Sequence, residues 1–172
     1  VDLFKYTAHE LHEKLVNKEI TAVELTNAVY DRIAAVDEQV NAYISLSKEE
    51  ALAKAAEVDA KIAAGEAIAP LAGIPVVFKD NINIYGQVTS CASKMLQGVE
   101  TVFDAHVTEE LRKEDAVFLG KANMAEFSIG NTTDNSFNGA AHNPWNLNCT
   151  TGGCATAAAV AAGEAVWALA SD

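Results

Sequence analysis

The stretch GIPVVFKDN, residues 73–81, decides the fold of this chain. Residues 74–78 are apolar without alternation, which is typical of a strand covered on both faces. Lys79 follows directly and allows two interpretations. Its side chain reaches into water, as most lysines do, or it is held at the crevice beyond the strand, where desolvation favours a neutral amine that accepts a proton. The residue pattern alone leaves both open.

The segments that follow repeat a strand and helix pattern. A polar, Asn-rich loop interrupts this pattern, and its Trp145 is expected to pack beneath it. Strands that alternate with helices predict an α/β fold with a mixed, largely parallel sheet flanked by helices. The expected segments are a helix at 105–114, a strand at 116–120, the loop at 130–148, a helix at 156–162 and a strand at 165–170.

The first third of the chain reads as helical. Three hydroxyl residues are followed by glutamate at the spacing of a capping box, and a short strand is expected at 41–46. The pairs are Thr7 with Glu10, Thr21 with Glu24, and Ser47 with Glu50. We therefore divide the chain into an N-terminal helical region, 1–66, and the first part of an α/β core, 67–172. That core is expected to be incomplete, because the chain stops directly after the third strand.

Composition limits the possible functions. The chain has 172 residues and a formal net charge of -12, which disfavours contact with phosphate backbones unless a partner supplies the positive charge. Its apolar runs are shorter than the roughly 18 residues of a membrane span, and its N-terminus lacks a signal-peptide pattern. Three cysteines without a CxxC pair fit a reducing compartment. We expect a cytoplasmic protein that does not enter a membrane.

Four blocks of sequence resemble the amidase signature family. They are LHEKLVNKEITAVELTNAVYDRIAAVD, PLAGIPVVFKDNINIYGQVTSCASKML, GKANMAEFSIG and HNPWNLN, in the family's order and spacing. The resemblance extends over essentially the whole chain, and within the family it is strongest to the A subunits of tRNA-dependent amidotransferases. It implies the amidase signature fold and amide hydrolysis by a Ser–cis-Ser–Lys triad, in which the buried lysine activates a serine.

The resemblance assigns roles to particular residues. Lys79 matches the family's base, and residues 127–130 (Phe127, Ser128, Ile129, Gly130) are expected to face the substrate. Where the family has GGSSGGSAAAV, this chain has the shorter GGCATAAAV at 152–160. Aligned from the first glycines, Cys154 replaces the relaying cis-serine; aligned from the alanines, Gly152 does. A thiol is a weaker hydrogen-bond donor than a hydroxyl, so a weakened relay is expected.

The family's nucleophilic serine lies beyond ALASD, residues 168–172, in a loop whose amides also form the oxyanion hole. The chain by itself is therefore expected to be inactive. Cys154 could instead be a nucleophile, since thiols are reactive and a helix is expected to begin just after it. The alternative is a small buried cysteine with a packing role.

Partners and cofactors are likewise implied by the resemblance. The substrate would be glutamine or another small amide, and the ammonia would convert Glu-tRNA(Gln) to Gln-tRNA(Gln). No metal or cofactor is implied for the chain itself, because a B subunit handles ATP, magnesium and the tRNA, with a small C subunit beside it. Two alternatives remain open: a stand-alone small-molecule amidase, and a non-catalytic truncated remnant or interaction fragment.

Overall fold

A four-stranded sheet forms the centre of the computed structural model, which describes residues 3–171. Strand β2 lies between two parallel neighbours, and β1 adds an antiparallel edge. The observed sheet confirms the expected mixed, largely parallel arrangement. In spatial order its strands are β1 (Tyr43–Leu46), β3 (Val117–Ala122), β2 (Pro75–Lys79) and β6 (Trp167–Leu169).

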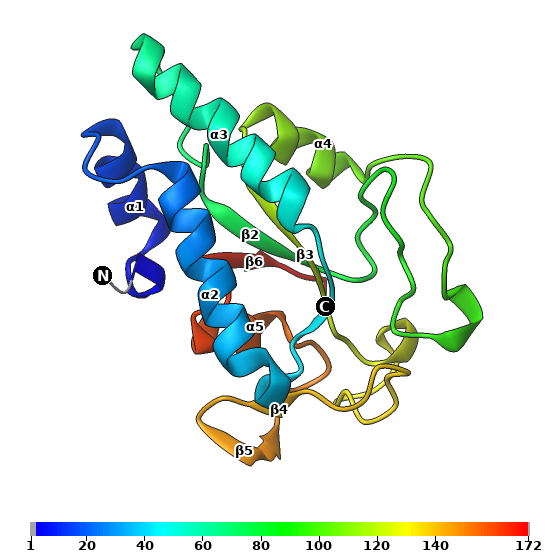
Figure 1. Ribbon diagram of the computed structural model, residues 1–172. Coiled ribbons are helices and arrows are strands. Elements are labelled where there is room, and N and C mark those ends of the chain that lie inside the picture. Colours follow the sequence, from blue (N-terminus) through cyan, green and yellow to red (C-terminus); the bar gives the residue numbers. More distant parts are fainter. Residues whose placement is uncertain (1–2, 172) are drawn as a thin grey trace.

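Helices cover both faces of this sheet (Figure 1). The longer helices α2 and α3 pack on one face together with α5, and α4 closes part of the other face through Leu111. The α-helices are α1 (Ala8–Val16), α2 (Ala22–Val40), α3 (Lys48–Ala64), α4 (His106–Lys113) and α5 (Thr156–Ala162); single 3-10 turns are η1 (Leu3–Lys5), η2 (Lys94–Leu96) and η3 (Glu126–Ser128).

The helix starts follow the capping pattern in two cases of three. Thr7 and Thr21 each accept the amide of the glutamate three residues later, and that glutamate bonds back to the threonine amide. Helix α3 begins after Ser47 as expected, yet Ser47 makes no capping bond. The expected third box is wrong because the Glu50 carboxylate accepts a hydrogen bond from Gln87 Nε2 at 2.9 Å instead.

The N-terminal helices and the sheet share one apolar core. Side chains of α1, α2 and α3 pack in one cluster with residues of β2, β3 and α5. Leu11 and Leu25 are fully buried in it, and each such burial contributes roughly 1.5–3 kcal/mol. Polar links cross the same core: Tyr30 Oη donates to the Leu119 carbonyl at 2.9 Å, and Tyr43 Oη donates to the Glu164 carbonyl at 2.7 Å.

The Asn-rich loop contains a hairpin that the sequence pattern does not reveal. Strands β4 (His142–Asn143) and β5 (Asn146–Thr150) pair antiparallel, and every residue of β5 is exposed, so no apolar alternation marks it. Trp145 lies at the hairpin turn and is 85% exposed, so its expected packing under the loop is wrong. Among residues 3–171, none of the helices has the length and apolar character that a bilayer crossing requires.

Candidate active site

Lys79 ends strand β2 with its side chain buried at 4% exposure. Its Nζ donates to the Ser171 carbonyl at 2.7 Å and to Ser171 Oγ at 3.2 Å. Ser171 follows strand β6, which runs parallel to β2, so both residues lie at the carboxyl ends of neighbouring strands. Ligand crevices of α/β sheets lie at this edge. The interpretation in which Lys79 reaches into water is therefore wrong.

Cys154 reaches the same edge of the sheet from the turn before α5. An antiparallel bridge to Met124 holds this turn against the segment that leaves β3. On either side of Cys154, the Ala125 amide donates to the Gly153 carbonyl and the Ala155 amide donates to the Asn123 carbonyl, both at 2.9 Å. The thiol itself is half-buried and lies 2.7 Å from Thr156 Oγ1.

Lys79 and Cys154 both line one cavity of about 220 Å³. We call it the Lys79 cavity. Segments far apart in the chain meet in it, because β2, the loop after β3, the turn before α5 and the end of β6 all converge at one edge of the sheet. Its lining residues are Lys79, Ser128, Gly130, Asn131, Gly153, Cys154 and Ser171.

The four residues expected to face a substrate do not all lie in this cavity. Ser128 and Gly130 line it, whereas Phe127 and Ile129 are 42% and 74% exposed and are not among its lining residues. The backbone conformation explains the division, because Phe127 and Ser128 have left-handed φ values of 51° and 61°. Two successive left-handed residues turn the chain sharply, and after this turn Ser128 and Gly130 line the cavity.

The wall between Gly130 and Gly153 is a close backbone contact. A Cβ placed on Gly153 would lie 2.7 Å from the Gly130 carbonyl oxygen, so a side chain at this position would push the two segments apart. Glycine is therefore required at 153 for the turn to approach this wall.

Sequence reasoning missed three polar residues of the site. Asn131 and Ser171 line the cavity, and Asn81 Nδ2 donates to Ser171 Oγ at 2.8 Å and to Ser128 Oγ at 3.4 Å. Asn81 stands two residues after Lys79, and Ser171 follows the parallel strand β6. Their positions after strand ends were the available signal.

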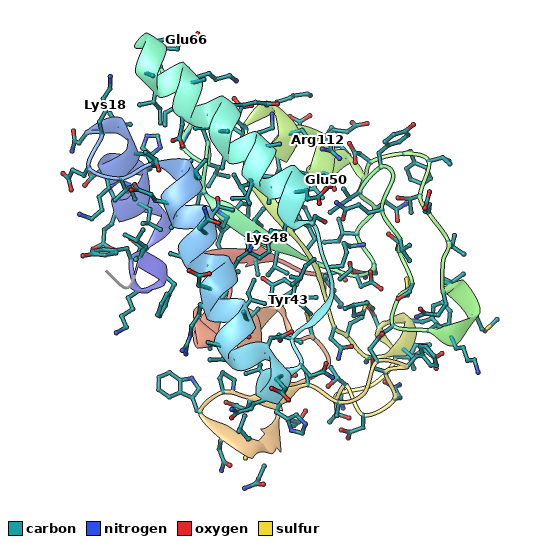
Figure 2. The ribbon with its side chains drawn as sticks, viewed as in Figure 1. Lys18, Tyr43, Lys48, Glu50, Glu66 and Arg112 are labelled. Carbon is teal, nitrogen blue, oxygen red and sulfur yellow. The ribbon has the colours of Figure 1, made fainter. Side chains whose placement is uncertain are left out.

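A second, smaller cavity of about 90 Å³ lies between α3 and α4. Glu50 and Arg112, labelled in Figure 2, both line it, together with Gln87. Two polar groups there already have partners, since Gln87 Nε2 donates to Glu50 and the Arg112 guanidinium bonds Asp104 at 2.6 Å. Gln87 Oε1 has no hydrogen-bond partner within residues 3–171. Within residues 3–171, no three His, Cys, Asp or Glu side chains gather in a way that could hold a metal ion.

The chain is similar to known proteins in sequence and in fold. Residues 24–172 match the Amidase family. The chain is 49% identical to the A subunit of a glutamyl-tRNA(Gln) amidotransferase from Desulforamulus reducens, over 100% of this chain and 36% of that protein. A solved peptide amidase from Stenotrophomonas maltophilia superposes with a TM-score of 0.85 at 34% identity, covering 94% of this chain and 35% of the other. The glutamyl-tRNA(Gln) amidotransferase A subunit of Thermotoga maritima superposes with a TM-score of 0.79 at 34% identity, covering 99% and 34%.

The chain belongs to the amidase signature family. It spans 36% of the length of curated relatives such as the Desulforamulus reducens protein. The family match includes β2 with Lys79 and the turn with Cys154.

Proposed function

We propose that this chain forms part of the glutamine-hydrolysing A subunit of a glutamyl-tRNA(Gln) amidotransferase. The observation that carries the proposal is the position of Lys79, whose amine is buried at the end of β2 and shares one cavity with Cys154. The 49% identity to such an A subunit supports the same assignment over the whole chain. The cytoplasmic location, the B and C subunits, and ATP and magnesium at the B subunit belong to this proposal.

The roles of the cavity residues follow from their chemistry. Lys79 acts as the base, because its amine donates only to neutral oxygen atoms of Ser171 among the hydrogen bonds seen here and can exchange a proton across the cavity. Cys154 passes that proton between the amine and the hydroxyl of the nucleophilic serine, which the family resemblance places beyond residues 168–172. The proton balance is simple: the hydroxyl loses a proton to the Cys154–Lys79 pair as it attacks the amide carbon, and the pair returns it to the departing ammonia.

Ser128, Gly130 and Asn131 form the wall against which an amide would lie. Ser128 Oγ accepts a hydrogen bond from Asn81, which fixes the orientation of this hydroxyl beside Lys79. Phe127 and Ile129 are exposed neighbours of Ser128 and Gly130 in the chain, and they would contact the remainder of a substrate rather than its reacting amide. A wall fixed in this way presents polar groups without the need for rearrangement when a substrate binds.

A stand-alone amidase is the second candidate. It is favoured by the TM-score of 0.85 to the peptide amidase, which exceeds the 0.79 to the amidotransferase chain. The replacement of a serine by Cys154 favours a third possibility, a non-catalytic remnant, because a thiol donates weakly. Substrate range and dependence on the B subunit distinguish the three.

The test is ammonia release by the protein that carries these residues, assayed with glutamine and with small peptide amides, with and without B and C subunits. We expect glutamine hydrolysis that increases when the B subunit is added, and a loss of at least about 100-fold in the Lys79→Met variant. The isolated 172-residue chain should release no ammonia above background. Full turnover by Lys79→Met would contradict the proposal, and hydrolysis of peptide amides without B would favour the stand-alone amidase.

A further inference from the structure

Asp80 and Lys121 form a buried ion pair next to the Lys79 cavity. Asp80 follows Lys79 directly, and the two charged side chains are 1% and 0% exposed. Lys121 Nζ lies 3.2 Å from Asp80 Oδ1 and donates to Thr89 Oγ1 at 3.0 Å. Burial lowers the pKa of Lys121, and the Asp80 carboxylate opposes that change. Removal of either partner would leave an uncompensated buried charge.

The second oxygen of Asp80 holds a strained turn. Oδ2 accepts hydrogen bonds from the Ser90 amide at 3.1 Å, from Ser90 Oγ at 2.6 Å and from the Ala92 amide at 3.3 Å. Within this turn Cys91 and Ala92 have φ values of 50° and 54°. The left-handed conformation is unfavourable for residues other than glycine, and hydrogen bonds to a carboxylate are strong enough to offset that cost.

The 90–92 turn is in turn bonded to the segments that form the wall of the Lys79 cavity. The Phe127 amide donates to the Cys91 carbonyl at 3.0 Å, and the Phe137 amide donates to the Ala92 carbonyl at 2.9 Å. Phe127 immediately precedes Ser128, which lines the Lys79 cavity. A continuous path of contacts therefore runs from Lys121 through Asp80 and the 90–92 turn to the cavity wall.

We propose that Asp80 and Lys121 are positioning residues, which fix the cavity wall at Ser128 and Gly130 by holding the 90–92 turn in its left-handed conformation. The proposal rests on the proposed function, because the wall matters only if an amide reacts beside it. Asp80 acts through its two oxygens, one bound to the sheet and one to the turn. Lys121 acts by pairing with Asp80 Oδ1, which leaves Oδ2 directed toward the turn.

Cys91 reports on this arrangement because it lies in the turn itself. Burial raises the pKa of its thiol, the Asp80 carboxylate raises it further, and Lys121 lowers it; these are the charged groups that face it. Iodoacetamide labelling of each cysteine against pH, followed by mass spectrometry, measures that pKa. We expect Asp80→Asn to lower the pKa of Cys91 and Lys121→Met to raise it. A loss of packing alone would move both variants in the same direction.

Hydrogen exchange at backbone amides measures how firmly the segments of the cavity wall are held. We expect the Phe127 and Phe137 amides to exchange at least about tenfold faster in both variants. Asp80→Asn weakens the hydrogen bonds that hold the turn with their acceptors, and Lys121→Met removes the partner that orients Asp80. The Asn41 amide, which donates to the Asp37 carbonyl at the end of α2, should not change and serves as the control. Ser90→Ala removes one bond to Asp80 and gives a milder variant, with a smaller acceleration at the same two amides, if the charge variants fold poorly.

The positioning role would be overturned if the Phe127 and Phe137 amides exchange at unchanged rates in folded Asp80→Asn. It would also be overturned if the pKa of Cys91 shifts in the same direction in Asp80→Asn and Lys121→Met. Neither measurement uses glutamine or a second protein. The positioning result therefore stands or fails separately from the ammonia-release assay.

Discussion

The residue that best shows what burial does to a charged group is Glu164, at the junction of α5 and β6. Its side chain is fully buried, and as an ionised carboxylate it receives no hydrogen bond within residues 3–171. In its protonated form it can donate one to the Asp37 carboxylate. Burial and the neighbouring Asp37 carboxylate raise the pKa of Glu164 to about 8. The folded protein therefore favours the protonated acid, in contrast to the unfolded chain, in which glutamate ionises near its ordinary value.

This shift predicts how stability depends on pH. A carboxyl whose pKa is raised by folding stabilises the protein below its unfolded pKa, and that stability is lost as pH rises through the folded pKa. The chain should lose roughly 2–4 kcal/mol between about pH 4.5 and pH 8 from this residue. Urea unfolding of the chain and of Glu164→Gln across this range checks the prediction. The variant should become progressively more stable than the parent as pH rises, and a constant difference would contradict it.

At the same scale, the sequence identified Lys79 but could not orient it. A lysine after a buried strand is compatible with solvent or with a crevice, and the choice depends on Ser171, which lies 92 residues away and accepts its hydrogen bonds. Asn81 and Ser171 were missed for the same reason. Their roles depend on which strands are neighbours in the sheet, and the local periodicity of apolar residues does not predict strand order.

At the scale of elements, the pairing of β1 with β3 depends on a single glycine. Gly120 has a φ of 149°, and a Cβ there would lie 2.1 Å from the Ser45 carbonyl oxygen. Ser45 belongs to β1, so the two strands are too close for any side chain at this point. Only glycine permits the antiparallel edge to form in this register.

Gly120→Ala should therefore destabilise the chain by roughly 2–4 kcal/mol, since a backbone oxygen cannot move aside without separating the strands. Gly98→Ala is the matched control, because its φ is also positive at 76° but nothing lies within 4 Å of its Cβ. That control should lose only about 1 kcal/mol. Thermal or urea denaturation compares the two, and equal losses would show that the contact with Ser45 does not limit stability.

The elements also show where sequence patterns are sufficient. Helix α5 was expected at 156–162 and is observed over Thr156–Ala162, because small apolar residues and a terminal glycine mark both its type and its end. The β4–β5 hairpin was missed because none of the residues of β5 is buried. Patterning detects elements through the surface that they bury, so an element without a buried face gives no signal.

At the scale of the whole molecule, the candidate site depends on the assembly of distant segments. Lys79, Ser128, Cys154 and Ser171 come from four parts of the chain, and the parallel strands bring them to one edge of the sheet. The fold class and the positions of Lys79 and Cys154 could be derived from the sequence and its family resemblance. The cavity itself could not, because its shape depends on the left-handed turns at 91–92 and 127–128, which carry no glycine.

The central claim is that the Lys79 amine acts on Cys154 across one cavity. The rate of iodoacetamide labelling at Cys154 near neutral pH tests it, with the exposed Cys149 as an internal standard and Lys113→Met as a surface control. A base that takes the thiol proton generates the thiolate that iodoacetamide alkylates. The account predicts that Lys79→Met slows labelling of Cys154 by at least about fivefold, while Cys149 keeps its rate. Equal rates at Cys154 in the folded variant and the parent would contradict it.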